Sequence, residues 1–317
     1  MKLFFTPIVF GCILLVCTYR VSGQNENPSP FIPEIITEFS NVRDLTISTT
    51  ENEMYFTVQS PLSELSSIVV VKKSNEGKWG LPEVASFSGK CNDLEPFLSP
   101  DGLKLYFVSN RPVEDTSKST KDFDIWMVGR RDARSAWSIA MNMGPAVNSK
   151  DNEFYPAVTK SGNLYFTCDG SLSKGKDDIF ICKWNIDNYE APVSLSDSIN
   201  SEGYEFNAYV DPDESFIVYT CYNRSGGSGS GDLYISYNLG NGFWSGAKNL
   251  GKNINSPQMD YCPFVNPKTE TLYFTSKRSN VKPTSFEQLT IADFKKEVNR
   301  FDNGWSRLYV VPLKSKN

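Results

Sequence analysis

The sequence predicts an all-β protein, a five-bladed β-propeller built from four-stranded antiparallel blades. A short strand of β-branched and aromatic residues recurs five times, at intervals of 51, 59, 53 and 55 residues, with starts at Met54, Leu105, Leu164, Ile217 and Leu272. Other strand-like segments keep the same phase around it, which gives about four strands in each repeat of about 50 residues. The fifth repeat ends after its third strand, and a strand-like segment precedes the first repeat. This combination is typical of a propeller whose ring is closed by the N-terminus.

The first segment of the chain is predicted to be an export signal. Residues 3–17 are an apolar run behind Lys2, and a membrane span needs about 20 such residues. Val21 and Gly23 suit the −3 and −1 positions of a cleavage site. We therefore expect a signal peptide over residues 1–23, a flexible leader over 24–30 and one propeller domain over 31–317. An uncleaved anchor is the alternative, and no other run is long enough to span a bilayer.

The innermost strands of blades 2 to 5 are predicted to lead into tight turns. Proline suits the second turn position, and Asp or Gly suits the later ones. The strands are Pro96–Leu98, Pro156–Val158, Ala208–Val210 and Pro263–Val265, and the turns that follow them are Ser99–Gly102, Thr159–Gly162, Asp211–Glu214 and Asn266–Thr269.

The outer strands follow the recurring second strand. Third strands are expected at 68–71, 125–128, 179–182, 233–236 and 308–311, and weaker fourth strands follow Trp79, Trp137, Tyr189 and Trp244. The segment Phe31–Ile36 is expected to be the outer strand of the last blade. Such pairing would close the ring and remove an exposed sheet edge.

Several motifs make the repeat similar to a known one. Ser99–Gly102, Leu105–Phe107, Asn110–Arg111 and Asp124–Trp126, with the lead-in Asn249–Gly251 and Ile254–Ser256, resemble the WD40-like (PD40) repeat of the TolB-type propeller family. The similarity extends through all five repeats. It implies an exported binding module of Gram-negative bacteria, in the periplasm, at the cell surface or secreted. We count five repeats where the TolB propeller has six and find no preceding α/β domain, so the particular partner of TolB is not carried over.

Composition excludes several classes of function. The chain contains no histidine, which removes Ser-His-Asp and Cys-His catalysis and every His-ligated metal or haem site. A net charge of −5 and a pI of about 5.1 argue against nucleic-acid binding. An odd number of cysteines follows the signal, without CxxC spacing, so no zinc site is expected; one disulfide stays open among Cys91, Cys168, Cys182, Cys221 and Cys262.

Four acids recur at the start of the innermost strands, at Asp93, Glu153, Glu205 and Asp260, where blade 1 has Val42. Three of them stand five residues after the Asn of an Asn-Ser pair. One interpretation is a ligand-binding face around the channel mouth for a polyhydroxyl ligand or a cation such as calcium, although no cofactor is expected. The other interpretation is that each acid caps backbone amides of the adjacent loop, and equal repetition favours capping.

Long, uneven loops between second and third strands reach the same face. The last of them, 277–305, contains Ser285–Val298 at near-helical spacing, which predicts a short helix with Ser285 as its N-cap. The insertion is either a binding face or an idle elaboration. Three loops begin with Arg111, Arg224 and Arg278, which either pair with Asp124, Asp178 and Asp232 or capture an anion.

Two functions remain open from the sequence. The first is a non-enzymatic exported propeller that binds a protein or glycan partner in the cell envelope. The alternative is a glycan-processing hydrolase that uses Asp93, Glu153, Glu205 or Asp260, since two carboxylates suffice for glycoside hydrolysis. The near-equivalence of the four acids favours binding, because catalysis needs carboxylates in differentiated environments.

Overall fold

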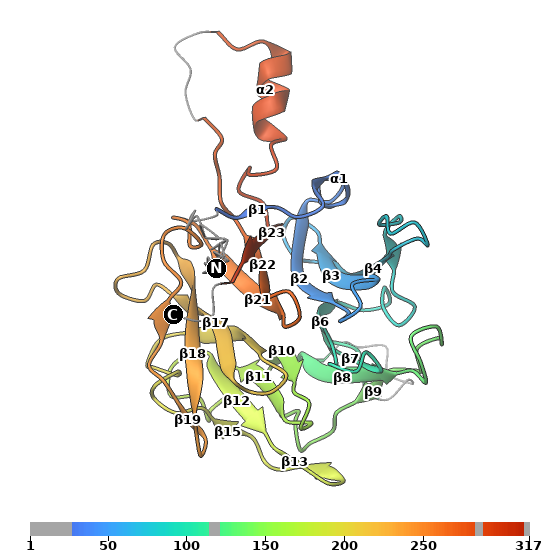
Figure 1. Cartoon of the computed structure of the whole chain (residues 1–317), viewed down its shortest axis with the longest axis vertical. Helices are drawn as coiled ribbons and strands as arrows, with labels where there is room; N and C mark the ends of the chain where they lie inside the picture. Colours follow the sequence, from blue (N-terminus) through green and yellow to red (C-terminus); the bar gives the residue numbers. More distant parts are fainter. Residues whose placement is uncertain (1–26, 114–120, 283–287, 314–317) are drawn as a thin grey trace, which may run out of the picture.

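A computed structural model describes residues 27–113, 121–282 and 288–313, and it shows five blades arranged around a central axis (Figure 1). Four blades take their strands in chain order from the axis outward. Blade 1 contains β2 (Asn41–Ile47), β3 (Glu53–Gln59), β4 (Ser66–Lys72) and β5 (Glu83–Val84). Blade 2 contains β6 (Asp93–Leu98), β7 (Lys104–Ser109), β8 (Asp124–Gly129) and β9 (Met141–Asn142).

Blades 3 and 4 carry an extra hairpin at their outer edge. Blade 3 contains β10 (Glu153–Val158), β11 (Leu164–Cys168), β12 (Asp178–Cys182) and β15 (Val193–Ser194), with the hairpin β13 (Trp184–Asn185) and β14 (Asn188–Tyr189). Blade 4 contains β16 (Glu205–Val210), β17 (Phe216–Tyr222), β18 (Gly231–Gly240) and β20 (Lys248–Asn249), and β18 also pairs with β19 (Phe243–Trp244).

The N-terminal segment closes blade 5, as predicted, but through different residues. Blade 5 contains β21 (Asp260–Asn266), β22 (Thr271–Ser276), β23 (Arg307–Pro312) and the outer strand β1 (Ser29–Pro30). The expected strand Phe31–Ile36 is wrong, because β1 ends at Pro30 and Pro33–Ile36 form the helix α1; Phe31 keeps one backbone bond to Leu308 of blade 5. Proline presets φ for the first helical turn and has no N–H to give to a strand. Ser29 and Pro30, the last two residues of the expected leader, belong to the sheet.

The ring has two distinct faces. The innermost strands begin on one face, to which the loops between second and third strands return; we call it the loop face. The turns between first and second strands lie on the opposite face, which we call the turn face. The core packs between neighbouring blades, around fully buried side chains of the recurring second strand such as Tyr55, Phe56, Phe107, Phe166 and Phe274.

Each innermost strand carries a β-bulge at the same position. The register with the second strand shifts in all five blades, and the residue inside the bulge has a positive φ of 49–60°. None of these residues is glycine, so each costs about 1–2 kcal/mol of backbone strain. The repeated bulge turns one side chain per blade toward the axis; the five are Asp44, Glu95, Tyr155, Asn207 and Cys262.

The predicted helix in the last long loop is present as α2 (Ile291–Val298). Its N-cap is Thr290, which forms a reciprocal capping box with Asp293; the expected cap Ser285 lies outside the described residues. Figure 1 shows α2 extending away from the ring. No helix within the described residues is long and apolar enough to cross a bilayer.

Candidate functional site

The four predicted acids lie at the joints between blades, and all are buried, with 0–1% of each residue exposed. Each carboxylate accepts hydrogen bonds from the loop that leads into its own blade. The backbone N–H and hydroxyl of Ser201 donate to Glu205 at 2.7 and 2.8 Å, and Ser149 donates in the same way to Glu153 at 3.1 and 2.6 Å. Asp260 accepts from the N–H of Ser256, and Asp93 accepts from the Ser88 hydroxyl and the Gly89 N–H. These are the bonds that the capping interpretation predicts, and ligand binding by the four acids stays a prediction.

The Asn side chain of each Asn-Ser pair forms hydrogen bonds to the backbone of the preceding blade. The Asn148 side chain accepts from the N–H of Ile125 at 2.9 Å and donates to its carbonyl at 3.0 Å. Asn200 makes the same two bonds to Ile179, and Asn255 makes them to Leu233. The repeated motif thus joins the third strand of one blade to the first strand of the next.

The three predicted arginines pair with these acids, not with Asp124, Asp178 and Asp232. Arg111 Nη2 donates to Asp93 at 2.6 Å, and the equivalent distances are 2.8 Å from Arg224 to Glu205 and 2.9 Å from Arg278 to Asp260. Each guanidinium also donates to a carbonyl of the joint, at Phe87, Ile199 or Ile254. The expected Arg–Asp braces are therefore wrong, and Asp178 and Asp232 instead accept from backbone N–H groups of their own loops.

Glu153 differs from the other three acids because it has no arginine partner. The position held by arginine in blades 2, 4 and 5 is Gly170 in blade 3. Burial raises the pKa of Glu153 to about 7, although its two bonds from Ser149 oppose the shift. Its Oε2 atom is buried and has no hydrogen-bond partner among the described residues.

A second polar cluster occupies the axis, and the sequence analysis did not identify it. Arg43 donates from Nε to Asp44 and from Nη2 to Glu95, both at 2.7 Å, and it also contacts the Cys262 thiol at 3.6 Å. Arg43 keeps 18% of its side chain exposed, whereas Asp44 and Glu95 keep 0% and 4%. Of the three side chains, that of Arg43 is therefore the most exposed.

Glu95 holds three blades together from this position. In three blades the N–H of the bulge residue donates to a threonine hydroxyl of the preceding blade: Asp44 to Thr275, Glu95 to Thr57 and Asn207 to Thr167. Blade 2 has Val108 where this threonine stands, so the N–H of Tyr155 donates to Glu95 Oε2 instead, at 2.7 Å. Burial raises the pKa of Glu95 to about 7, although Arg43 and this N–H oppose the shift.

Both clusters are built to satisfy buried charge. Glycoside hydrolysis needs two carboxylates with separate roles and room for a sugar between them. Asp44 and Glu95 instead share one guanidinium. The four joint acids accept from amides or hydroxyls of their loops, and three of them also pair with an arginine. No group of three His, Cys, Asp or Glu side chains that could hold a metal ion is found in the described parts of the chain, and the calcium alternative stays a prediction. The five described cysteines are free thiols.

Comparison with known proteins shows the fold alone. No protein-family model matches the chain, so the PD40 resemblance stays a prediction, and no curated protein matches it. A glycoside hydrolase is similar in structure, with a TM-score of 0.53 and 7% identity over 87% of this chain and 90% of that one. An α-L-arabinofuranosidase from Podospora anserina in complex with cellotriose gives 0.52 and 11%, over 86% and 90%. TolB from Acinetobacter baumannii gives 0.47 and 15%, over 76% of this chain and half of that one.

Proposed function

We propose that this chain is an exported, non-enzymatic binding module that recognises a protein or glycan partner in the bacterial cell envelope. The observation that carries the proposal is the internal pairing of its carboxylates. Asp93, Glu205 and Asp260 each bond an arginine and a loop amide or hydroxyl, and Asp44 and Glu95 share Arg43. A buried carboxylate that is already charge-paired in this way serves the scaffold.

The surface supports a role in binding. α2 has a complete capping box, yet none of its residues is buried, and its apolar side chains Ile291 and Phe294 are exposed. A helix that is stabilised by its own cap and extends from the ring presents a preformed surface to another molecule. Export is proposed from the apolar segment 3–17, and a location in the envelope from the resemblance of the repeat motif.

The alternative, a hydrolase, depends on Glu153. A carboxyl with a pKa near 7 could act as a general acid, but it would need to leave its bonds to Ser149 and find a second carboxylate beside the same sugar. The two functions therefore differ in one measurable property, which is turnover.

The test is release of 4-nitrophenol from a panel of 4-nitrophenyl glycosides, measured for the wild-type protein and for Glu153→Gln and Glu95→Gln. We expect release at the rate of buffer alone in all three samples. A wild-type rate above buffer that either substitution lowers a hundredfold or more would contradict the proposal and assign that carboxylate to catalysis.

A further inference from the structure

The five blades repeat one groove on the turn face, and its contents differ from copy to copy. Each groove lies between neighbouring blades and is lined by three equivalent positions. Two of them flank Met54, Leu105, Leu164, Ile217 or Leu272 in the second strand of one blade. The third, in the next blade, lies two residues after the third-strand residue that pairs with the equivalent of Met54. The five copies can be compared with one another, because a position that only supports the fold tends to keep the same residue type in every blade.

The groove between blades 1 and 2 is filled by the chain itself. Arg130 from blade 2 forms an ion pair with Glu53 of blade 1, and only 3% and 5% of these side chains is exposed. Tyr55 donates to the same carboxylate at 3.1 Å, and Arg130 stacks on Trp137 at 4.3 Å. Charge, hydrogen bonds and aromatic contact leave this groove closed.

A glutamate occupies two other grooves. Glu214 of blade 4 accepts from Asn163 at 3.0 Å and from Tyr165 at 2.7 Å, both in blade 3. Glu51 of blade 1 accepts from Asn266 of blade 5 at 2.6 Å. In each case a turn residue with positive φ places its carboxylate across the joint.

The groove between blades 2 and 3 has neither filling. Gly162 stands where the other two grooves have the turn glutamate. A Cβ at this position would lie 2.9 Å from Cγ of Trp184, which is too close for a side chain. Lys104 stands at the position equivalent to Glu53, and Trp184 stands at the position equivalent to Arg130. A pocket of about 280 Å³ results. A second open groove lies between blades 4 and 5, lined by Phe216, Tyr237 and Leu313, but it lacks an exposed indole.

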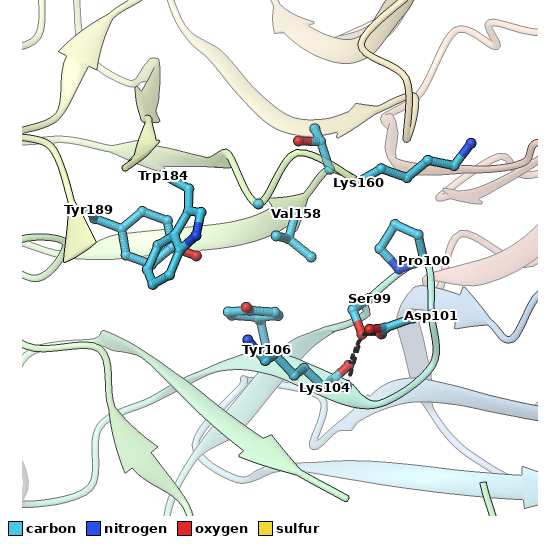
Figure 2. Close-up of a pocket in the computed structure, with 11 residues that line it drawn as sticks. Ser99, Pro100, Asp101, Lys104, Tyr106, Val158, Lys160, Trp184 and Tyr189 are labelled. Carbon is cyan, nitrogen blue, oxygen red and sulfur yellow. Dashed lines mark hydrogen bonds between the residues drawn. The ribbon is translucent and has the colours of Figure 1, made fainter. Parts of the chain in front are cut away.

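The pocket combines an aromatic wall with a polar wall. Figure 2 shows Trp184 and Tyr189 on one side, Ser99 and Asp101 on the other, and Tyr106 between them. Trp184 is 39% exposed and lies edge-to-face against Tyr189 at 4.9 Å. Lys104 makes no ion pair with any described residue, whereas Lys160 extends away from the pocket and pairs with Asp213.

We infer that this pocket is a glycan subsite, in which a sugar ring stacks on Trp184 while its hydroxyls bond to Lys104 and Asp101. The inference rests on the proposed binding function and names its ligand class. A pyranose ring has an apolar C–H face and equatorial hydroxyls at its rim, which match an exposed indole beside one ammonium and one carboxylate. A peptide would use a free strand edge, and the pocket is lined by two turns and a hairpin instead.

Saturation-transfer NMR on the purified protein tests the inference with trisaccharides of glucose, galactose, xylose and N-acetylglucosamine, and with a proline-rich decapeptide. We expect at least one trisaccharide to bind, with a Kd at least tenfold higher for Trp184→Ala. Trp305→Ala is the matched control, because Trp305 is also 39% exposed but follows α2, away from this pocket. The Trp305→Ala variant should bind the trisaccharide with the affinity of the wild type.

A second variant separates loss of the site from loss of the fold. Trp184→Arg combined with Lys104→Glu transplants the Arg130–Glu53 pair into this groove, and we expect a folded protein without trisaccharide binding. Binding that persists in either variant, binding of the peptide alone, or no trisaccharide binding would overturn the inference. New anomeric signals in the same spectra would report cleavage. Cleavage would contradict the non-enzymatic function, but it would not contradict sugar binding in this groove.

Discussion

At the scale of single residues, the fold handles buried carboxylates in two ways. Three joint acids are paired with arginine, whereas Glu153 accepts only neutral donors among the described residues, from Ser149 and, at 3.9 Å, from the Cys168 thiol. The folded-state pKa of Glu153 is about 7, above the ordinary 4.5 of an unfolded glutamate. Between these values the native state binds a proton that the unfolded state has lost, so the contribution of Glu153 to stability is full below pH 4.5 and is lost as pH rises to about 7.

Glu153→Gln should therefore stabilise the protein at pH 8 and leave it nearly unchanged at pH 5. The expected gain at pH 8 is on the order of 3 kcal/mol, since the pKa rises from 4.5 to about 7 on folding and each pKa unit corresponds to about 1.4 kcal/mol. Urea unfolding at the two pH values measures it. Glu205→Gln is the matched control, because it leaves the partly buried Arg224 without its charge partner and should destabilise at both pH values. An equal effect of Glu153→Gln at pH 5 and pH 8 would contradict this interpretation.

The sequence reveals the joint acids but not the axial cluster. Asp93, Glu153, Glu205 and Asp260 recur in phase, so pattern alone finds them. The five axial residues share a backbone conformation rather than a chemical type, and none is the glycine that usually signals positive φ. Their one sequence signal is indirect: Val108 breaks the series Thr57, Thr167, Thr220 and Thr275, and Glu95 replaces the missing hydroxyl.

At the scale of elements, the repeat period predicts the strands well because each blade is one hydrophobic unit packed on its neighbours. The irregular segments are predicted less well. The apolar residues Ile32, Ile35 and Ile36 suit a strand, but Pro33 begins a helical turn there and Ile36 becomes fully buried in it. The ring is instead closed by Ser29 and Pro30, which pair with β23 although neither residue type favours a strand.

The closing segment should determine the stability of the ring. A chain that begins at Thr37 loses β1 and α1, including the contact of Phe31 with Tyr273 at 5.0 Å and the buried Ile35 and Ile36. We expect a loss of about 3–6 kcal/mol from the removed apolar burial, and association through the exposed edge of β23. Urea unfolding and size-exclusion chromatography measure both effects. A chain that begins at Asn27 is the control, and equal stability and size of the two chains would contradict the closing role.

At the scale of the whole molecule, the two faces serve different purposes. The loop face carries the insertion with α2, and the turn face carries the groove between blades 2 and 3. The axis between them is a buried polar cluster in which Arg43 links Asp44, Glu95 and Cys262 from three blades. Under the proposed function, the centre of the propeller is a scaffold and recognition takes place at its rims.

The accessibility of Cys262 tests that central claim most directly. Cys262 is 1% exposed, and burial raises the pKa of its thiol, whereas Cys91 is partly exposed. Alkylation of the native protein with iodoacetamide, followed by mass spectrometry of its peptides, compares the two thiols in one sample. We predict labelling of Cys91 within minutes and no labelling of Cys262 until urea unfolds the ring. Labelling of native Cys262 at the rate of Cys91 would show an open axial pocket and contradict the closed scaffold.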